Sequence, residues 1–292
     1  MLPPDLLTKI RRIQIRTTHM VSDLFAGQYH SVFKGQGMEF QEVREYTAGD
    51  DIRAIDWNVT ARMGHPFIKK YVEERELTVM LLVDISRSND FGSQSQIKRD
   101  LAAEVAAVLA FAAIQNNDRV GLILFSDEAE HYLPPRKGTR HVLRVIRDVL
   151  YYKAKKPGTS IAAGLNFLNN VATRKTVTFI ISDFMDTNYE SALAVSAKRH
   201  DLISIVIRDH RERALAAAGL IEWEDAETGR RALIDTSSAN SRRFFEESHQ
   251  RRQQLLMDTF KKRGVDVIEL TAGKPYANEL VRFFKKREKR RR

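Results

Sequence analysis

Carboxylate and hydroxyl side chains gather in three short stretches of this 292-residue sequence. The candidates for binding chemistry are Asp84, Ser86, Ser88, Thr159 and Asp183. All of them offer hard oxygen atoms, which suit Mg²⁺, Mn²⁺ or Ca²⁺ better than zinc. Alternate side chains of an extended segment point to the same side, so Asp84, Ser86 and Ser88 can present three oxygens to one ion. We therefore expect a divalent-cation site, with Mg²⁺ as the first choice, completed by water or by a ligand carboxylate.

Helix capping is the alternative interpretation of each stretch taken alone. Serines that follow a strand often cap the next helix, and Thr159 could cap the helix predicted to start beside it. Asp183 could likewise cap the turn that follows it. Because all three stretches lie at predicted strand ends or helix starts, we favour one shared metal site over three separate caps.

Asp84 could instead be a phosphoryl-accepting nucleophile, as in phosphatases that resemble haloacid dehalogenases. Those enzymes place a second aspartate two residues later, where this chain has Ser86. The sequence also lacks a Gly-x-Ser-x-Gly nucleophile elbow, a Walker A phosphate loop and a His-Glu-x-x-His motif. A metal-dependent phosphohydrolase using Asp84 stays an alternative, but a binding module that is not an enzyme fits these residues better.

The elements that must position these residues follow an alternating strand and helix pattern from residue 77 onward. Short aliphatic runs separated by amphipathic segments predict an α/β fold with a mostly parallel sheet flanked by helices. Ligand-binding residues collect at the carboxyl ends of such strands, so the three stretches converge if strands 77–83 and 176–181 are neighbours. The expected strands are Leu77–Val83, Arg119–Phe125, Thr176–Ile181, Leu202–Ile207 and Val265–Leu270, with Glu130–Leu133 as an antiparallel edge. The expected helices are Ile97–Asn117, Arg140–Leu150, Ile161–Val171, Tyr189–Arg199, Ser237–Arg263 and Tyr276–Lys286.

Two further segments depart from this alternation. Residues 219–235 contain two short strands around a Glu-Thr-Gly turn, which predicts a small hairpin insertion. Residues 30–76 are expected to form a segment of strands and turns, preceded by a basic helix over 6–24. We therefore expect a first domain, residues 1–76, that packs on an α/β domain, residues 77–292.

The acidic residues of this first domain are expected to hold it in place. Ion pairs of Asp50, Asp51 and Asp56 with Arg53 and Arg62 would attach the segment to the sheet, although such pairs contribute little energy when exposed. Trp57 is expected to be the apolar anchor of the segment.

The composition of the chain narrows the cell compartments in which we expect it and the partners that we expect it to bind. The chain has no cysteine, no apolar leader, and no apolar run longer than the ten residues Val105–Ile114. We therefore expect a cytoplasmic protein without a transmembrane segment.

The net charge is +10, and the tail Lys285–Arg292, with seven bases and one acid, supplies +6 of it. Such a tail can bind polyanions or an anionic membrane surface, and this stays a further alternative. No nucleic-acid motif or aromatic interleaving accompanies it, so nucleic acid is an unlikely partner and a solvated, frayed terminus is the favoured interpretation.

The stretches DISRS, GTSIAAGL and ISDF resemble the three metal-site loops of the von Willebrand factor A (vWA) domain. In that family an Asp-x-Ser-x-Ser loop, a distant Thr and a distant Asp form a metal-ion-dependent adhesion site (MIDAS). The resemblance implies that Asp84, Ser86 and Ser88 form the first loop, Thr159 the second and Asp183 the third. It also implies that a partner's carboxylate commonly supplies the sixth ligand of the ion.

Residues 44–76 closely resemble the bacterial DUF58 family, which joins such a segment to an A-type domain. The residues that carry this resemblance are Arg44, Tyr46, Gly49, Asp50, Arg53, Asp56, Trp57, Ala61 and Arg62. Both resemblances together cover about Gly35 to Asp183. Members of the family are commonly encoded beside MoxR-type AAA+ ATPases. The resemblance thus implies an adaptor that works with such an ATPase, or with an acidic client protein, in complex assembly or remodelling.

Overall fold

The computed structural model describes residues 10–14, 17, 39–72, 76–92 and 96–291. The chain forms two compact units: the smaller one ends at Leu77, beside the predicted junction, and the larger one resumes at Thr78 and also includes the described residues 10–14 and 17. These N-terminal residues therefore do not group with the smaller unit, as the prediction of one first domain over residues 1–76 required. Of the basic helix predicted over 6–24, residues 10–14 and 17 are helical, and the remainder lies outside the described residues. Among the described helices, none combines the length and the apolar character that crossing a membrane requires.

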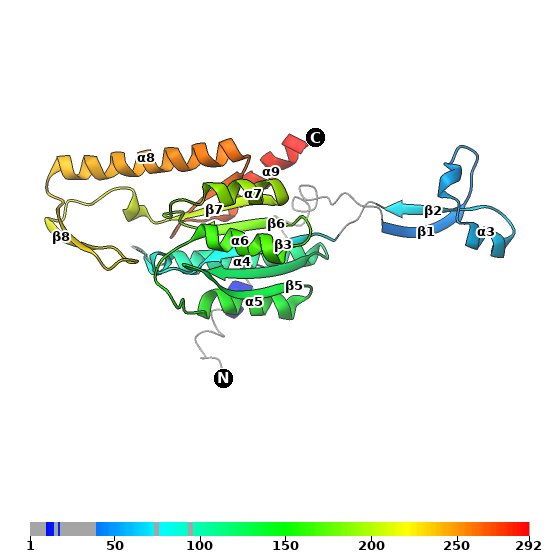
Figure 1. Cartoon of the computed structure of the whole chain (residues 1–292), viewed down its shortest axis with the longest axis horizontal. Coiled ribbons are helices and arrows are strands. Elements are labelled where there is room, and N and C mark those ends of the chain that lie inside the picture. Colours follow the sequence, from blue (N-terminus) through cyan, green and yellow to red (C-terminus); the bar gives the residue numbers. More distant parts are fainter. Residues whose placement is uncertain (1–9, 15–16, 18–38, 73–75, 93–95, 292) are drawn as a thin grey trace. The chain divides into compact units, whose positions relative to one another are not determined.

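A mostly parallel sheet of six strands forms the centre of the larger unit (Figure 1). Its strand order is β10-β7-β6-β3-β4-β5, and β5 pairs with β4 in the antiparallel direction. The strands are β3 (Thr78–Asp84), β4 (Arg119–Phe125), β5 (Ala129–Arg136), β6 (Val177–Ser182), β7 (Asp201–Arg208) and β10 (Asp266–Thr271). Nearly every residue of β3 and all of β6 are buried, as in strands that are covered on both faces. The predicted α/β fold is confirmed, including its antiparallel edge strand.

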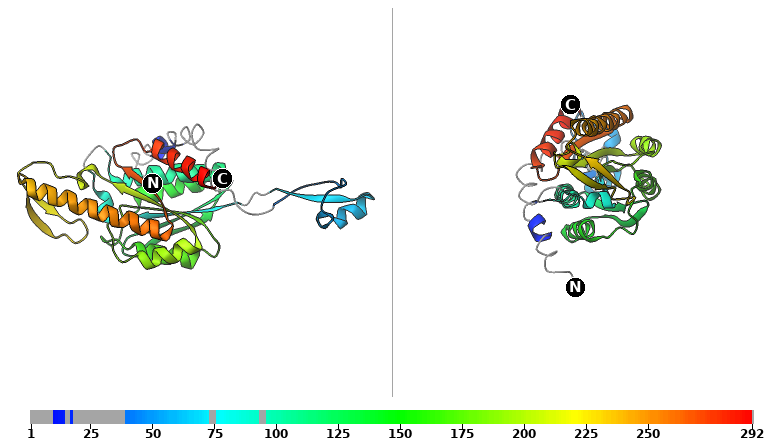
Figure 2. Two further views of the ribbon diagram at one scale, coloured as in Figure 1. Left: turned by 90° about the horizontal axis from the view of Figure 1, so that it is seen from above. Right: turned by 90° about the vertical axis from the view of Figure 1, so that its left-hand side faces the viewer.

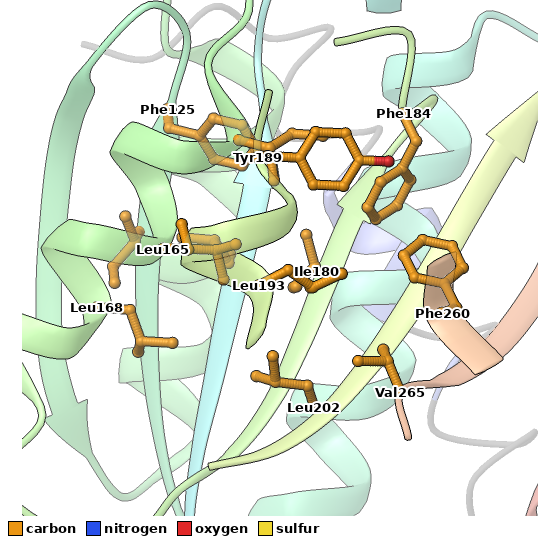
Figure 3. Packing of buried hydrophobic residues seen from close by; sticks show 14 of the residues in the cluster. Phe125, Leu165, Leu168, Ile180, Phe184, Tyr189, Leu193, Leu202, Phe260 and Val265 are labelled. Carbon is orange, nitrogen blue, oxygen red and sulfur yellow. The ribbon is translucent and has the colours of Figure 1, made fainter. Parts of the chain in front are cut away.

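Helices cover both faces of this sheet (Figure 2). Helix α4 (Lys98–Gln115) packs against α5 (Thr139–Tyr151), and α6 (Ile161–Val171) packs against α7 (Glu190–Arg199). One apolar cluster joins α6, α7 and the long helix α8 (Ala239–Arg263) to the sheet, through Leu165, Leu193 and Phe260 (Figure 3). Each fully buried side chain of this size contributes about 1.5–3 kcal/mol, so the cluster holds the strands in place beneath the helices.

The strand order reverses next to β3. The chain runs from β3 to β4 on one side and later enters β6 on the other side. Ligands of open α/β sheets bind at such a switch point, outside the carboxyl ends of the strands. Val83 lies beside Ile181 in the register, which brings Asp84 level with Ser182. The two strands on whose adjacency the site prediction depends are therefore neighbours.

The predicted hairpin consists of β8 (Leu220–Glu224) and β9 (Arg231–Asp235). It projects beyond the carboxyl ends of the parallel strands (Figure 1). In the turn of this hairpin, the Asp225 carboxylate accepts hydrogen bonds from the backbone N–H groups of Glu227 at 3.1 Å and Thr228 at 2.7 Å. These bonds fix the turn, and with it the position from which the Glu227 side chain extends.

The smaller unit contains two short helices in addition to the expected strands. Strand β1 (Glu39–Glu45) pairs in the antiparallel direction with β2 (Phe67–Val72). Between them lie the 3₁₀ helix η2 (Ile52–Ala54) and helix α3 (Trp57–Met63). A segment predicted as strands and turns therefore also contains helical turns.

The polar residues of the smaller unit have local roles. The side chains of Asp51 and Asp56 cap η2 and α3, respectively, by accepting backbone hydrogen bonds. Asp50 pairs with Arg44 at 2.7 Å, so the prediction that Asp50 pairs with Arg53 or Arg62 was wrong. Trp57 is 67% exposed on a helix that buries no residue, so it forms no core within the smaller unit, and its role as an anchor on the sheet stays a prediction.

The basic tail is a folded helix up to Arg291, where we expected a frayed terminus. Helix α9 (Ala277–Arg291) carries Arg287, which is 5% exposed and pairs with Asp201 and, at 2.9 Å, with Asp266. These aspartates start β7 and β10, at the end of the sheet opposite the switch point. The prediction of a solvated tail was wrong for this arginine, because the tail neutralises carboxylates of the sheet. Polyanion binding by its exposed bases stays a prediction.

Replacing Arg287 by methionine is expected to lower the free energy of unfolding by about 3 kcal/mol, because it leaves two half-buried carboxylates without their cation. Arg290 is the matched control, since it pairs with Asp266 at 2.8 Å but is 63% exposed. Arg290→Met should cost less than about 1 kcal/mol, as surface pairs do. Urea unfolding at neutral pH measures both values, and equal losses would contradict the docked tail.

Candidate metal centre

Asp84 ends β3 and is 2% exposed. Its Oδ1 accepts a hydrogen bond from the backbone N–H of Ser86 at 2.9 Å, and its Oδ2 accepts one from the Ser182 hydroxyl at 2.7 Å. Burial, followed by the nearby charge of Asp183, raises the pKa of Asp84 to about 7. This shift shows that the site disfavours the charged form of Asp84, and a cation bound beside the carboxylate would reverse that preference.

Ser86 and Ser88 are joined by their hydroxyl groups, whose oxygens lie 2.9 Å apart. Ser86 is fully buried and lies at the N-cap of the 3₁₀ helix η3 (Arg87–Asp90), yet its side chain makes no capping hydrogen bond. The capping alternative therefore does not hold for Ser86. Its oxygen and that of Ser88 are turned toward each other, as the spacing predicts for two ligands of one ion.

Thr159 lies directly before α6, but it does not cap this helix. That role belongs to Ser160, whose hydroxyl accepts from the backbone N–H of Ala163 at 3.2 Å. The Thr159 hydroxyl donates to Oε1 of Glu227, in the hairpin turn, at 2.6 Å. A hydroxyl that donates its hydrogen keeps lone pairs for a cation, so this contact is compatible with metal binding. It also shows that a carboxylate from elsewhere in the chain fits against the second loop.

Asp183 is 1% exposed and is neutralised by a lysine. Lys98, at the start of α4, donates from Nζ to Asp183 Oδ2 at 2.7 Å and to Glu212 Oε1 at 2.6 Å. Burial alone would lower the pKa of Lys98, but the two carboxylates raise it above its usual value. The lysine therefore stays charged inside the protein. Among the described residues, Asp183 Oδ1 accepts one hydrogen bond, from the backbone N–H of Met185 at 3.2 Å, so Asp183 does cap the turn that follows it, as the alternative predicted. The second lone pair of this oxygen can still bind an ion or its water.

The charges of this cluster do not balance among the described residues. The ammonium of Lys98 pairs with Asp183 and Glu212, whereas Asp84 and Glu227 lie near Asp183 without an ion pair to this lysine, and the described residues contain no group of three or more His, Cys, Asp or Glu side chains that could hold a metal ion by themselves. Asp84 and Glu227 have hydroxyl and amide partners instead. Burial, and then the charge of Asp183, raises the pKa of Glu227 as well, although its bond to Thr159 opposes the shift. The donor set is all oxygen and short of positive charge, so it fits Mg²⁺ or a similar ion.

Backbone hydrogen bonds hold the loops of this cluster together. The N–H of Arg87, in the first loop, donates to the carbonyl of Pro157 at 3.2 Å, and the N–H of Ser160 donates to the carbonyl of Ser126 at 2.8 Å. The first and second loops are therefore connected directly. The third loop is connected to the first through Ser182 and Asp84.

The sequence analysis missed three charged residues of this cluster. Lys98 precedes Leu101 by three positions on the apolar face of α4, and a lysine on such a face indicates a buried partner. Glu212 forms a capping box with Asp209, and this pattern indicates a cap but not the contact with Lys98. For Glu227 we find no signal in the sequence, because nothing local to the hairpin shows where its turn lies in space.

Comparison with known proteins places these features in a family. The family described as "Protein of unknown function DUF58" matches residues 42–255. Uncharacterized proteins of Mycobacterium bovis (Mb1516) and Mycobacterium tuberculosis (Rv1480) are each 28% identical over 291 residues, covering 98% of this chain and 91% of theirs. The similarity therefore extends over both units.

Solved structures share the α/β architecture at much lower identity. An aerotolerance-related membrane protein from Bacteroides fragilis is 15% identical with a TM-score of 0.50, covering 73% of this chain and 99% of that chain. The VWA domain of SpRpn10 is 11% identical with a TM-score of 0.37, covering 71% of this chain and 94% of that chain. The likeness to the Bacteroides fragilis protein concerns the fold alone.

Proposed function

This chain belongs to the DUF58 family, and from that premise we propose that it is a protein-interaction module that binds an acidic residue of a partner through a divalent cation. The observation that carries the proposal is the buried pair of carboxylates at the switch point. Asp84 has no cation partner among the described residues, Asp183 lies close enough to raise its pKa, and two hydroxyls that cap nothing lie beside them.

The ion would be held by Asp84, Ser86, Ser88, Thr159 and Asp183. Its contribution would be a positive charge that a carboxylate of the partner can bind. The side chains of this chain hold the oxygens in place before any partner arrives, because their loops are tied by backbone hydrogen bonds. Such preorganisation lowers the cost of binding.

The same geometry favours binding over catalysis. A nucleophilic Asp84 would have to reach a phosphoryl group, which is much larger than a cation, yet the residue is only 2% exposed. A second carboxylate that could act as acid or base is absent two residues later, where Ser86 contacts Ser88. Asp183, the other carboxylate nearby, forms an ion pair with the ammonium of Lys98 at 2.7 Å, so its Oδ2 is already engaged.

The partner proposed from the DUF58 resemblance is a MoxR-type AAA+ ATPase in the cytoplasm, or an acidic client that such an ATPase remodels. The chain would then be an adaptor in complex assembly. A purified MoxR-type ATPase is the first partner to test.

The proposal predicts capture of this ATPase by the immobilised full chain in Mg²⁺ but not in EDTA. Asp84→Ala should reduce capture in Mg²⁺ by at least about tenfold, which corresponds to about 1.4 kcal/mol of binding free energy. Glu246→Gln, an exposed carboxylate of α8, is the control and should behave as the wild type. Capture that is equal in EDTA and unchanged by Asp84→Ala would overturn the metal-dependent interaction.

Glu227→Gln is expected to strengthen Mg²⁺-dependent binding of an acidic partner. In the wild type the Glu227 carboxylate holds the Thr159 hydroxyl at 2.6 Å and competes with a carboxylate of the partner. A hydrogen bond to a charged group contributes about 1.5–3 kcal/mol, so its weakening should raise affinity by roughly three- to tenfold. Surface plasmon resonance measures the change. Glu224→Gln, on the same hairpin but paired with Arg231, should leave the affinity unchanged, and equal effects of the two variants would contradict the competition.

A further inference from the structure

A pocket lined by cations opens beside the first loop of the candidate metal centre. Its volume is about 280 Å³, and its walls come from the loop after β3, from α4 and from the connection between α5 and α6. The charged residues that line it are Arg87, Arg99, Lys153, Lys155, Lys156 and, as the one carboxylate, Asp90. Five positive charges around one negative charge make this a site for anions.

Three of these five cations form no ion pair within the part of the chain that the structure describes. Arg99 pairs with Asp90 at 3.1 Å, and Lys156 pairs with Glu128 at 3.2 Å. No carboxylate in the described part of the chain forms an ion pair with the side chains of Arg87, Lys153 or Lys155. The pocket therefore keeps three cations available for a ligand.

Backbone hydrogen bonds hold the walls of the pocket in place. The backbone N–H of Arg87 donates to the carbonyl of Pro157 at 3.2 Å, which ties one wall to the other. The backbone N–H of Lys155 donates to the Glu130 carboxylate at 2.9 Å, and buried Ile85 contributes to the lining. Gathering like charges costs free energy, so fixed walls with this lining are explained better by an anionic ligand than by stability.

We infer that this pocket binds an acidic side chain of a peptide segment of the partner. The inference rests on the proposed function, because the pocket shares its walls with the candidate metal centre. Arg87 lies between Ser86 and Ser88, and Pro157 precedes Thr159 by two positions. A segment with several acidic residues can thus place one carboxylate at the ion and another among the cations. The volume suits a glutamate or aspartate side chain and is small for a nucleotide.

The test uses a fluorescein-labelled hexaglutamate peptide and the full chain, with fluorescence anisotropy as the readout in EDTA and in Mg²⁺. The pocket variant combines Arg87→Gln, Lys153→Gln and Lys155→Gln. The control variant removes the same charge from exposed positions of α8, with Arg243→Gln, Arg251→Gln and Arg252→Gln. In EDTA the pocket variant should bind the peptide at least about tenfold more weakly than the control variant, which should resemble the wild type.

The measurements in EDTA and in Mg²⁺ distinguish this inference from the proposed function. If the metal-dependent function fails, Mg²⁺ adds no affinity, while the loss in the pocket variant persists in EDTA. Equal binding by the pocket and control variants in EDTA would overturn the pocket. Displacement of the peptide by inorganic phosphate at lower concentration than by free glutamate would overturn the assignment to an acidic side chain.

Discussion

Asp84→Asn is expected to stabilise the metal-free protein at pH 8 and to abolish its stabilisation by Mg²⁺. Burial and the charge of Asp183 raise the pKa of Asp84 to about 7, so the ionised carboxylate destabilises the fold when no ion is bound. The amide removes that charge but cannot accept a hydrogen bond from Ser182 through its NH₂ group. We therefore expect a gain of only roughly 1–3 kcal/mol in EDTA, less than the full pKa shift implies.

In Mg²⁺ the wild type, and not Asp84→Asn, should be the more stable protein. An ion at one hundred times its dissociation constant stabilises the wild type by about 2.7 kcal/mol, which raises Tm by roughly 5–10 °C for a domain of this size. Asp84→Asn should show no such rise. Differential scanning fluorimetry in EDTA and in Mg²⁺ measures both effects. A Tm of the variant that rises as much as that of the wild type would show that any ion binds elsewhere.

The wild-type stability should also depend on pH in a defined direction. The folded-state pKa of Asp84 is raised, so the folded protein binds more protons than the unfolded chain between about pH 4 and pH 7. The contribution of Asp84 is therefore most favourable below pH 4, and it is lost as the pH rises to about 7. Mg²⁺ binding should strengthen over the same range, because the ion competes with the proton.

Lys98→Met is expected to lower the free energy of unfolding in EDTA by about 3–5 kcal/mol, the usual cost of removing one partner from a buried ion pair. The variant leaves Asp183 and Glu212 without their ammonium, and Asp183 is 1% exposed. Glu212→Gln introduced together with Lys98→Met should recover part of the loss. Mg²⁺ should recover a further part, because a cation beside Asp183 offsets the missing charge. Urea unfolding of the variants in EDTA and in Mg²⁺ measures each contribution.

The matched control for Lys98 is Lys156→Met. Lys156 also pairs with a glutamate, at 3.2 Å, but it is 51% exposed. Its removal should cost less than about 1 kcal/mol. Equal losses for Lys98→Met and Lys156→Met would contradict the view that the buried pair of Lys98 and Asp183 stabilises the fold.

The strands and helices of the larger unit were predictable because each depends on a local pattern. The helix predicted over Ile161–Val171 coincides with α6, and the strand predicted over Arg119–Phe125 coincides with β4. Buried parallel strands are short aliphatic runs, and their alternation with helices implies parallel pairing. The order of the strands does not follow from this alternation, so the adjacency of β3 and β6, which brings Asp84 and Asp183 together, was a condition of the site prediction that the structure meets.

The features that escaped prediction depend on contacts between distant residues. Arg287 pairs with Asp201 and Asp266, whose positions at the amino ends of two strands are known only once the sheet is assembled. Lys98 pairs with Asp183, which lies 85 positions later in the sequence. A large aromatic residue usually indicates a core, but Trp57 forms none within the smaller unit, because the short helix that carries it buries no residue.

Isothermal titration calorimetry of the metal-free full chain with Mg²⁺ at pH 8 tests the central claim most directly. The account predicts binding of one ion per chain by the wild type and by Glu246→Gln. It predicts no binding at the same site by Asp84→Asn. Equal binding by the wild type and Asp84→Asn, or no binding by either, would contradict a metal-dependent interaction module built on Asp84.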